Sequence, residues 1–490
     1  MEQQELIPHL FRTEYRKIVS VLCKRFGFDQ MEVAEDIASD TFLTAAQTWG
    51  LNGIPPHPVA WLYHVARNRA RSYLQREAVF KSKISPEIKK TTTGVEEQEI
   101  DLSPKNIEDS QLQMMFAICH PVISPESQIG LSLRILCGFG IDEIADAFLS
   151  NKETINKRLF RAREKLREEK IRIEIPDAGE IDKRLATVLT TIYLLFTEGY
   201  YSVSREGGVG REGGVSREGG VSRPGEIRKE LCVEAMRLCR MLVDNPLTDK
   251  PEVNALLSLM CFHASRLEAR VDEYGEIVLY DDQDTGRWNA GLIGEGGYFL
   301  SRSASGTVLS KYHLEANIAY WHCVKEDSTE KWENVLQLYN RLLQLEYSPI
   351  AALNRTFALS KTKGKRAAIV EAEKLKLEGN PFYFALLGEL YTTIDDQLAK
   401  EYLQKALWLA KTAGDKQVLQ KKIDRLGLGL GFFGLTKCHF VIFGRAGDFE
   451  VHETDLLFLI AILYGVYLVG VYFFLSFAEE HMESDLGNHL

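Results

Sequence analysis

Apolar residues recur three and four positions apart along most of this chain, and this spacing constrains its fold more than any other feature. In one segment they fall at Ile155, Leu159, Ala162 and Leu166, which places all four on one side of a helix. The same pattern runs, with interruptions, from about residue 6 to about residue 428. The sequence therefore predicts an all-α fold.

A chain of 490 residues is too long for a single hydrophobic core, so several domains are expected. A first helical unit is predicted over residues 1–83. A segment rich in Lys, Thr, Glu and Ser predicts a flexible linker over 84–111. A second helical unit is predicted over 112–175, a long helical extension over 176–428, and a tail of different composition over 429–490.

The eight cysteines are scattered, with no Cys-x-x-Cys pair, and the N-terminus does not resemble a signal peptide. A disulfide framework or a zinc ribbon is therefore not expected, and the sequence predicts a cytoplasmic protein without a cofactor. The acidic group Asp281, Asp282 and Asp284 could hold a cation or contact a basic protein surface. An exposed loop is the more common role for such a group.

The extension contains two kinds of repeat. The six-residue repeat SREGGV, over 204–227, follows each Arg with a Glu and carries Gly pairs, so an expanded loop is expected rather than an RNA-binding segment. Helix pairs are then predicted to start near Trp332, Lys365 and Gln397, at the spacing of tetratricopeptide repeats. A plain helical bundle is the alternative. Such a domain would bind a protein or ligand that the sequence does not identify.

The tail contains an uncharged apolar run over residues 456–478, long enough to cross a lipid bilayer as a helix. We interpret it as a C-terminal membrane anchor, which would make the membrane a partner of an otherwise cytoplasmic protein. A helix packed on the repeats and a tail foreign to the ancestral domain are the alternatives.

Basic residues gather in two windows although the formal net charge of the chain is −10. The second window belongs to a predicted helix-turn-helix, with a short helix over 141–149, a turn at 150–152 and a longer second helix. The exposed face of that helix would suit the major groove and the phosphates of duplex DNA. Its candidate DNA-binding residues are Thr154, Lys157, Arg158, Arg161 and Arg163. A basic surface helix of an ordinary bundle is the alternative.

The first unit carries an acidic helix followed by a basic one. Glu32, Asp36 and Asp40 repeat every four residues, a spacing at which like charges repel, so the stripe indicates either a basic protein partner or a solvated face. The helix predicted over 59–76 interleaves basic and aromatic residues, which suits a nucleic-acid backbone and unpaired bases. Its candidate residues are Trp61, His64, Arg67, Asn68 and Arg71.

Two stretches resemble a known family. The string AEDIASDTFLTAAQTW followed by PVAWLYHVARNRARSYLQRE is similar to region 2 of sigma factors of the extracytoplasmic-function type, and LSLRILCGFGIDEIADAFLSNKETINKRLFRAREKLRE resembles their region 4. The resemblance implies a protein that binds core RNA polymerase and directs promoter-specific transcription initiation. It assigns Asp36 and Asp40 to polymerase, the 59–76 helix to the −10 element of promoter DNA, and the helix over 154–163 to the −35 element.

Parts of the extension, among them TVLTTIYLLFTEGYYS and SPIAALNRTFALSKTKG, resemble the C-terminal extension of one sigma subgroup. This resemblance implies a tetratricopeptide-like domain that modulates activity in place of a separate anti-sigma factor. The sequence has no P-loop, Gly-x-Ser-x-Gly, His-Glu-x-x-His or Rossmann motif, so an enzyme is not expected. The alternative is a helix-turn-helix regulator that binds duplex DNA without polymerase and uses the extension as a sensor.

Overall fold

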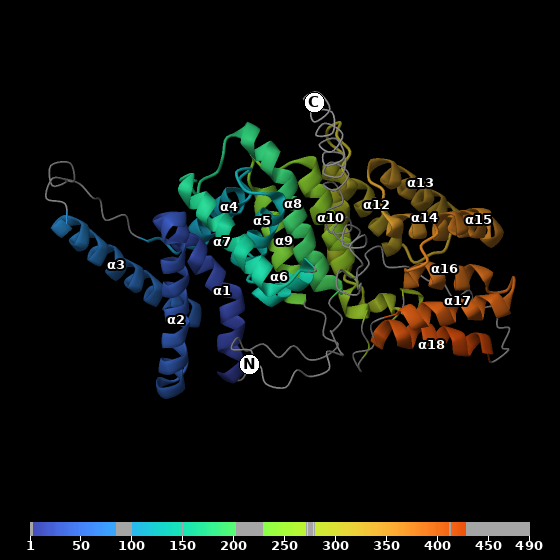
Figure 1. The fold of residues 1–490 in the computed structure, drawn as a ribbon, viewed down its shortest axis with the longest axis horizontal. Helices are drawn as coiled ribbons and strands as arrows, with labels where there is room; N and C mark the ends of the chain where they lie inside the picture. The colour runs from blue at the N-terminus through green and yellow to red at the C-terminus, as the bar shows by residue number, and fades with distance from the viewer. Residues whose placement is uncertain are drawn as a thin grey trace, which may run out of the picture. The chain divides into compact units, whose positions relative to one another are not determined.

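The computed structural model describes residues 3–84, 100–148, 150–201, 229–270, 272, 278, 280–410 and 413–427. Within these ranges the regular structure is helical and no strand occurs, which confirms the predicted all-α class (Figure 1). The chain forms two compact units. The first contains the residues up to Thr191 together with Asp244–Thr248, and the second contains most of the chain from Ile192 onward.

The first unit opens with three helices close to the predicted ones. They are α1 (Gln3–Phe26), α2 (Met31–Asn52) and α3 (Pro58–Ile84). Gly53 follows α2 with a φ of +82°, in the left-handed region that favours glycine, and so ends that helix before the prolines that precede α3. Leu62, Ala66 and Ala70 of α3 are fully buried, and their four-residue spacing places them on one face of the helix.

Four further helices complete most of this unit: α4 (Pro104–Ile118), α5 (Pro125–Ile135), α6 (Ile141–Ala147) and α7 (Lys152–Glu168). The side chains of Ser103, Ser124 and Asn151 cap the starts of α4, α5 and α7. Helix α4 begins inside the segment 84–111 that we predicted as a linker. That prediction is therefore too long at its C-terminal end. The sequence gives no apolar signal for this part of α4, because the helix buries polar residues such as Ser110 and Gln111.

Helix α1 lies at the centre of this unit. Six consecutive residues, 18–23, are each at most 3% exposed. Because successive residues of a helix point about 100° apart, such a run means that this part of α1 is covered on every side. Helices α2 and α3 contact α1, and α4 contacts it as well. The segments of the predicted first and second units therefore share one core.

The second unit contains the end of α8 (Ala178–Tyr201) and then α9 (Lys229–Asp244), α10 (Pro251–Ala264), α11 (Ala290–Ser303) and α12 (Lys311–Cys323). Three helix pairs follow. They are α13 (Thr329–Leu345) with α14 (Pro349–Lys363), α15 (Lys365–Leu375) with α16 (Pro381–Tyr391), and α17 (Asp396–Leu409) with α18 (Ala413–Gly427). Each pair begins within three residues of the start that the sequence predicts.

The acidic group between α10 and α11 contacts a lysine. The Lys325 ammonium donates hydrogen bonds to the carbonyl oxygens of Tyr280, Asp281 and Gln283, at 2.8, 3.0 and 3.3 Å. Asp284 caps the following turn by accepting a hydrogen bond from the Gly286 amide at 2.8 Å. No cluster of three or more metal-ligating side chains occurs among the described residues. The side chain of Lys325 therefore holds this loop through hydrogen bonds to its backbone.

Two predicted features fall outside the described residues. These are the six-residue repeat over 204–227 and the apolar run over 456–478. In the part of the chain that the structure describes, no helix is long and apolar enough to cross a membrane.

Glu315 on α12 is a buried carboxyl group, and burial raises its pKa from 4.5 to about 7. Such a group binds more protons in the folded state, so its contribution to stability falls as the pH rises from about 4.5 to about 7. We expect Glu315→Gln to raise the melting temperature of the full chain by several degrees at pH 8 and by much less at pH 5. Calorimetry at both pH values, with exposed Glu333→Gln as control, measures this. An equal change at both pH values would contradict it.

Candidate nucleic-acid interface

Helix α7 presents one buried face and one exposed face. Ile155, Leu159, Ala162 and Leu166 are all buried, as the sequence predicts. The packing is close, because a Cβ added at Gly130 of α5 would lie 3.0 Å from the Leu159 side chain. The Asn151 side chain accepts a hydrogen bond from the Thr154 amide at 2.8 Å and so fixes the start of the helix. The opposite face of α7 is therefore held in a defined orientation.

The five candidate residues of α7 do not share one surface. Thr154, Lys157 and Arg161 are exposed on the face opposite the core. Arg158 is half-buried, with its guanidinium 5.5 Å from the centre of the Phe148 ring. Arg163 is also half-buried and forms an ion pair with Glu35 of α2 at 3.0 Å. Three of the five are thus available to a ligand in this structure.

Phe160 is an exposed residue of α7 that the sequence did not single out. Its side chain is 65% exposed, and it lies on the helix between Leu159, which is buried, and Arg161, which is exposed. Burying a phenylalanine is worth about 2 to 3 kcal/mol, so this side chain, next to basic residues, is available for an apolar contact with a partner. Its exposure could have been predicted from the sequence, because it lies one residue after Leu159, which belongs to the predicted buried face.

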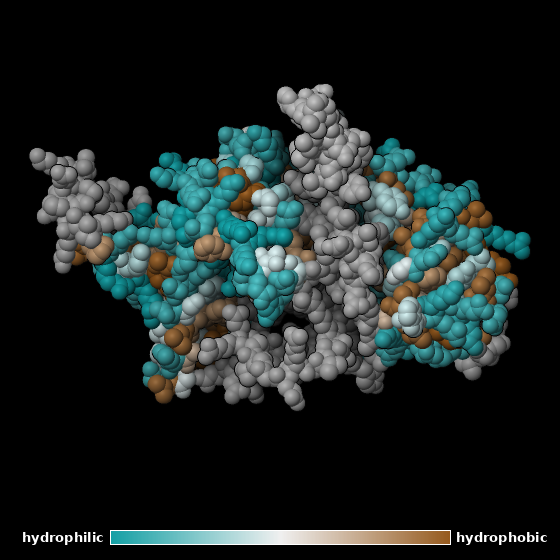
Figure 2. Space-filling model, viewed as in Figure 1, coloured by the Kyte–Doolittle hydropathy of each residue, from teal (hydrophilic) through white to brown (hydrophobic). Residues whose placement is uncertain are grey.

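Helix α2 presents an acidic face with apolar residues at its far end. Asp36 and Asp40 are exposed, and Asp40 pairs with Arg69 of α3 at 3.0 Å in an exposed ion pair. Leu43 and Leu51 lie further along the helix and are 56% and 87% exposed. Figure 2 shows hydrophobic colouring at the end of α2. The surface can therefore bind a partner through both charge and apolar contact.

The candidate residues of α3 differ in exposure. His64, Asn68 and Arg71 are exposed, and the side chains of His64 and Asn68 are hydrogen-bonded at 2.8 Å. Arg67 is half-buried. Trp61 is also half-buried and packs edge-on against Trp49 of α2, with ring centres 5.4 Å apart. The basic face predicted on α3 is therefore partly present, and its tryptophan also serves the core.

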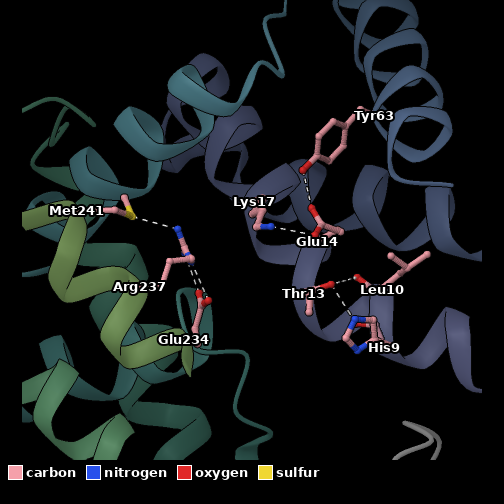
Figure 3. Close-up of polar contacts among 9 residues, drawn as sticks. All are labelled: His9, Leu10, Thr13, Glu14, Lys17, Tyr63, Glu234, Arg237 and Met241. Carbon is pink, nitrogen blue, oxygen red and sulfur yellow. Dashed lines mark hydrogen bonds and ion pairs between the residues drawn. The ribbon is translucent and has the colours of Figure 1, made fainter. Parts of the chain in front are cut away.

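A partly buried hydrogen bond joins α3 to α1. The Tyr63 hydroxyl donates to the Glu14 carboxylate at 2.5 Å, and the Lys17 ammonium donates to the same carboxylate at 2.9 Å (Figure 3). Because Tyr63 is the residue before His64, this contact fixes the part of α3 that carries the candidate residues. Helices α1, α2 and α3 all contact one another, so the acidic face of α2 and the basic face of α3 are presented by one packed group of three helices.

Comparison with known proteins identifies this group. The sigma-70 region 2 family model matches residues 10–79, which cover most of α1, all of α2 and most of α3. The RNA polymerase sigma-H factor of Pseudomonas aeruginosa is 30% identical over 158 residues, which are 31% of this chain and 79% of that factor. The chain belongs to the sigma-70 family. This sigma-70 family member therefore acts in transcription initiation. Members of this family are transcription factors and not enzymes.

Further matches extend beyond region 2 of this sigma-70 family member. An uncharacterised protein of Rhizobium meliloti (strain 1021) is 30% identical over 407 residues, 81% of this chain and 91% of that protein, so the two belong to one family. A family of unknown function (DUF6596) matches residues 184–304. No solved structure matches the chain. The region 2 match implies that the protein binds core RNA polymerase and promoter DNA.

Proposed function

We propose that this protein is a sigma factor of the extracytoplasmic-function type, in which α2 binds polymerase, α3 binds the −10 element and α7 reads the −35 element. The observation that carries the proposal is the succession of two differently charged surfaces in one packed group of helices, the acidic and apolar face of α2 and the basic face of α3, followed by the basic helix α7. A protein that only binds duplex DNA has no use for the first two surfaces.

Helix α2 is the proposed polymerase-binding surface, through Asp36 and Asp40. Both carboxylates are exposed, and the nearby Leu43 is apolar and exposed. Carboxylates at the rim of an interface attract a basic partner, while an apolar residue supplies contact area. This combination supports binding to a basic protein surface.

Helix α3 is the proposed contact with the −10 element. Single-stranded nucleic acid is bound by basic groups that follow the backbone and by aromatic or cationic groups that stack on unpaired bases. His64, Asn68 and Arg71 provide an exposed polar face, with Arg67 beside it. Trp61 contributes less area, because Trp49 covers part of it.

Helix α7 is the proposed contact with the −35 element, within a region 4 formed by α4 to α7. The major groove of B-form DNA is about 12 Å wide and admits an α-helix. Lys157 and Arg161 would contact phosphates or guanine edges, and Thr154 would contact a base edge or a phosphate. The exposed Phe160 fits a thymine methyl group. The alignment with the Pseudomonas sigma factor also supports a region 4. It covers 158 residues and is therefore longer than the region 2 match over residues 10–79.

The C-terminal extension is proposed to modulate this activity by binding a protein or ligand. Its three helix pairs begin at residues 329, 365 and 396, a spacing that supports a tetratricopeptide-like arrangement. Repeats of this type stack into extended surfaces that bind other molecules. In the alternative, a free-standing DNA-binding regulator, the same extension would act as the sensor.

Promoter melting distinguishes the two candidate functions, a sigma factor and a free-standing DNA-binding regulator. With core polymerase present, we expect the protein to make thymines near the −10 element of its target promoter reactive to permanganate, because base pairs must open there. Without polymerase, we expect no reactive thymines and only weak, salt-sensitive binding to duplex DNA. Tight, sequence-specific binding by the protein alone, with no melting when polymerase is added, would favour the free-standing regulator.

A further inference from the structure

A polar cluster is buried where α12 meets the first helix pair. Lys311 and Glu315 belong to α12, Tyr339 lies on α13, Glu346 is the residue after α13, and Tyr193 comes from α8. All five residues belong to the second unit, where apolar residues of α12 and α13 share one core (Figure 1). Glu315 is only 8% exposed. Because a buried charge is costly unless it is paired, the charges of this cluster depend on one another.

The cluster contains one cation for two carboxyl groups. The Lys311 ammonium lies 3.4 Å from the Glu346 carboxylate, and the two side chains are 15% and 16% exposed. The same ammonium lies 5.8 Å from the centres of the Tyr193 and Tyr312 rings. Glu315 is one helical turn from Lys311, and its buried Oε2 atom accepts no hydrogen bond from the part of the chain that the structure describes. Since Glu346 already balances Lys311, an ionised Glu315 adds an uncompensated negative charge.

Glu315 is the group of this cluster whose charge changes near neutral pH. Burial raises its pKa to about 7, while the Lys311 ammonium and a hydrogen bond from Tyr193 oppose this shift and the Glu346 carboxylate adds to it. Burial also raises the pKa of Glu346, and Lys311 opposes that shift directly. Tyr339 faces Glu315 from α13, and burial raises the pKa of its phenol, which therefore remains neutral. The titratable groups that act on Glu315 thus come from α8, α12 and α13.

We propose that Glu315 is a pH-sensitive switch in the extension, which holds the first helix pair firmly on α12 when it is protonated and loosens that contact when it ionises. The neutral acid is compatible with the apolar core around it. The carboxylate needs water or a further cation, and it reaches water only when α12 and α13 move apart. The inference concerns the second unit alone, so it does not depend on the proposed sigma-factor function.

The expected size of this effect follows from the two states of the contact. When the contact opens and water reaches Glu315, its pKa returns to about 4.5, whereas in the closed contact it is about 7. The proton therefore stabilises the closed contact, fully at low pH and less as the pH rises through about 7. From about pH 6 to about pH 8, the population of the open contact should rise about tenfold.

Amide hydrogen exchange of the full chain, followed by mass spectrometry of its peptides, measures this opening. After correction for the intrinsic pH dependence of exchange, peptides of α12 and α13 should exchange about tenfold faster at about pH 8 than at about pH 6. Glutamine cannot ionise, so Glu315→Gln should bring the two corrected rates to within about twofold of each other. Glu333→Gln, the same change at an exposed residue of α13, is the control and should keep the tenfold difference.

A second variant tests the role of the shared lysine. Glu346→Gln frees Lys311 to pair with Glu315 and removes a negative charge beside it, so the difference between the two pH values should fall below about threefold. Equal corrected rates in the unaltered chain, or a tenfold difference that survives Glu315→Gln, would overturn the proposal. So would an equal acceleration in peptides of α17, because the whole unit would then be opening rather than the contact between α12 and α13.

Discussion

Reversing the charge of both exposed carboxylates on α2, with Asp36→Arg and Asp40→Arg, should weaken the binding of core polymerase about 100-fold. Placing like charges across an interface costs several kcal/mol, and about 3 kcal/mol corresponds to roughly two orders of magnitude in the dissociation constant. The fold should survive, because the lost pair between Asp40 and Arg69 is exposed and worth at most about 1 kcal/mol, and solvent screens the like-charge pair that replaces it. Fluorescence anisotropy of a labelled chain titrated with core polymerase measures the loss.

The control for this variant is a charge reversal of the same size elsewhere in the same unit. Glu108 and Asp109 are neighbouring exposed residues of α4, and reversing both should change the affinity by less than about threefold. If the two double variants weaken binding equally, a general charge effect explains the loss. If neither does, α2 is not the polymerase-binding surface.

Removing two basic side chains from α7, with Lys157→Ala and Arg161→Ala, should lower the affinity for the upstream promoter element about 30- to 800-fold. Each contact with a base edge or a phosphate is worth about 1 to 2 kcal/mol, and alanine keeps the helix intact. Binding to core polymerase should be unchanged, since neither residue lies on α2. The measurement is competition between promoter fragments with and without the upstream element, for the polymerase complex.

Lys105→Ala with Lys183→Ala serves as the matched control, because both lysines are exposed in the same unit but outside α7. That variant should lose little affinity and no preference for the upstream element. An α7 variant that keeps full preference would place the reading surface elsewhere. A loss of polymerase binding in the same variant would point to damage of the whole unit instead.

The sequence predicted those parts of the structure that depend on local periodicity. The buried residues Ile155, Leu159, Ala162 and Leu166 could be named in advance, because one helix must bury one continuous face. The starts of the three helix pairs were predicted within three residues for the same reason. The start of α4 was missed, since its buried Ser110 and Gln111 give no apolar signal.

Contacts between distant segments could not be predicted from the sequence. The ion pair between Glu35 and Arg163 joins residues 128 positions apart, and nothing in either helix alone indicates it. Arg163 therefore looked like a fourth exposed basic residue of α7, although its side chain faces α2. Trp61 likewise looked free to stack on bases, because only the packing of α3 against Trp49 shows that its ring is half-covered.

Run-off transcription with bacterial core polymerase tests most directly whether this protein is a sigma factor. The template set should include the fragment upstream of its own gene, and the reaction should contain no other sigma factor. We expect a transcript of defined length that requires the added protein and disappears with the Asp36→Arg and Asp40→Arg variant. The absence of any protein-dependent start site, from polymerase that is active with another sigma factor, would contradict the proposal.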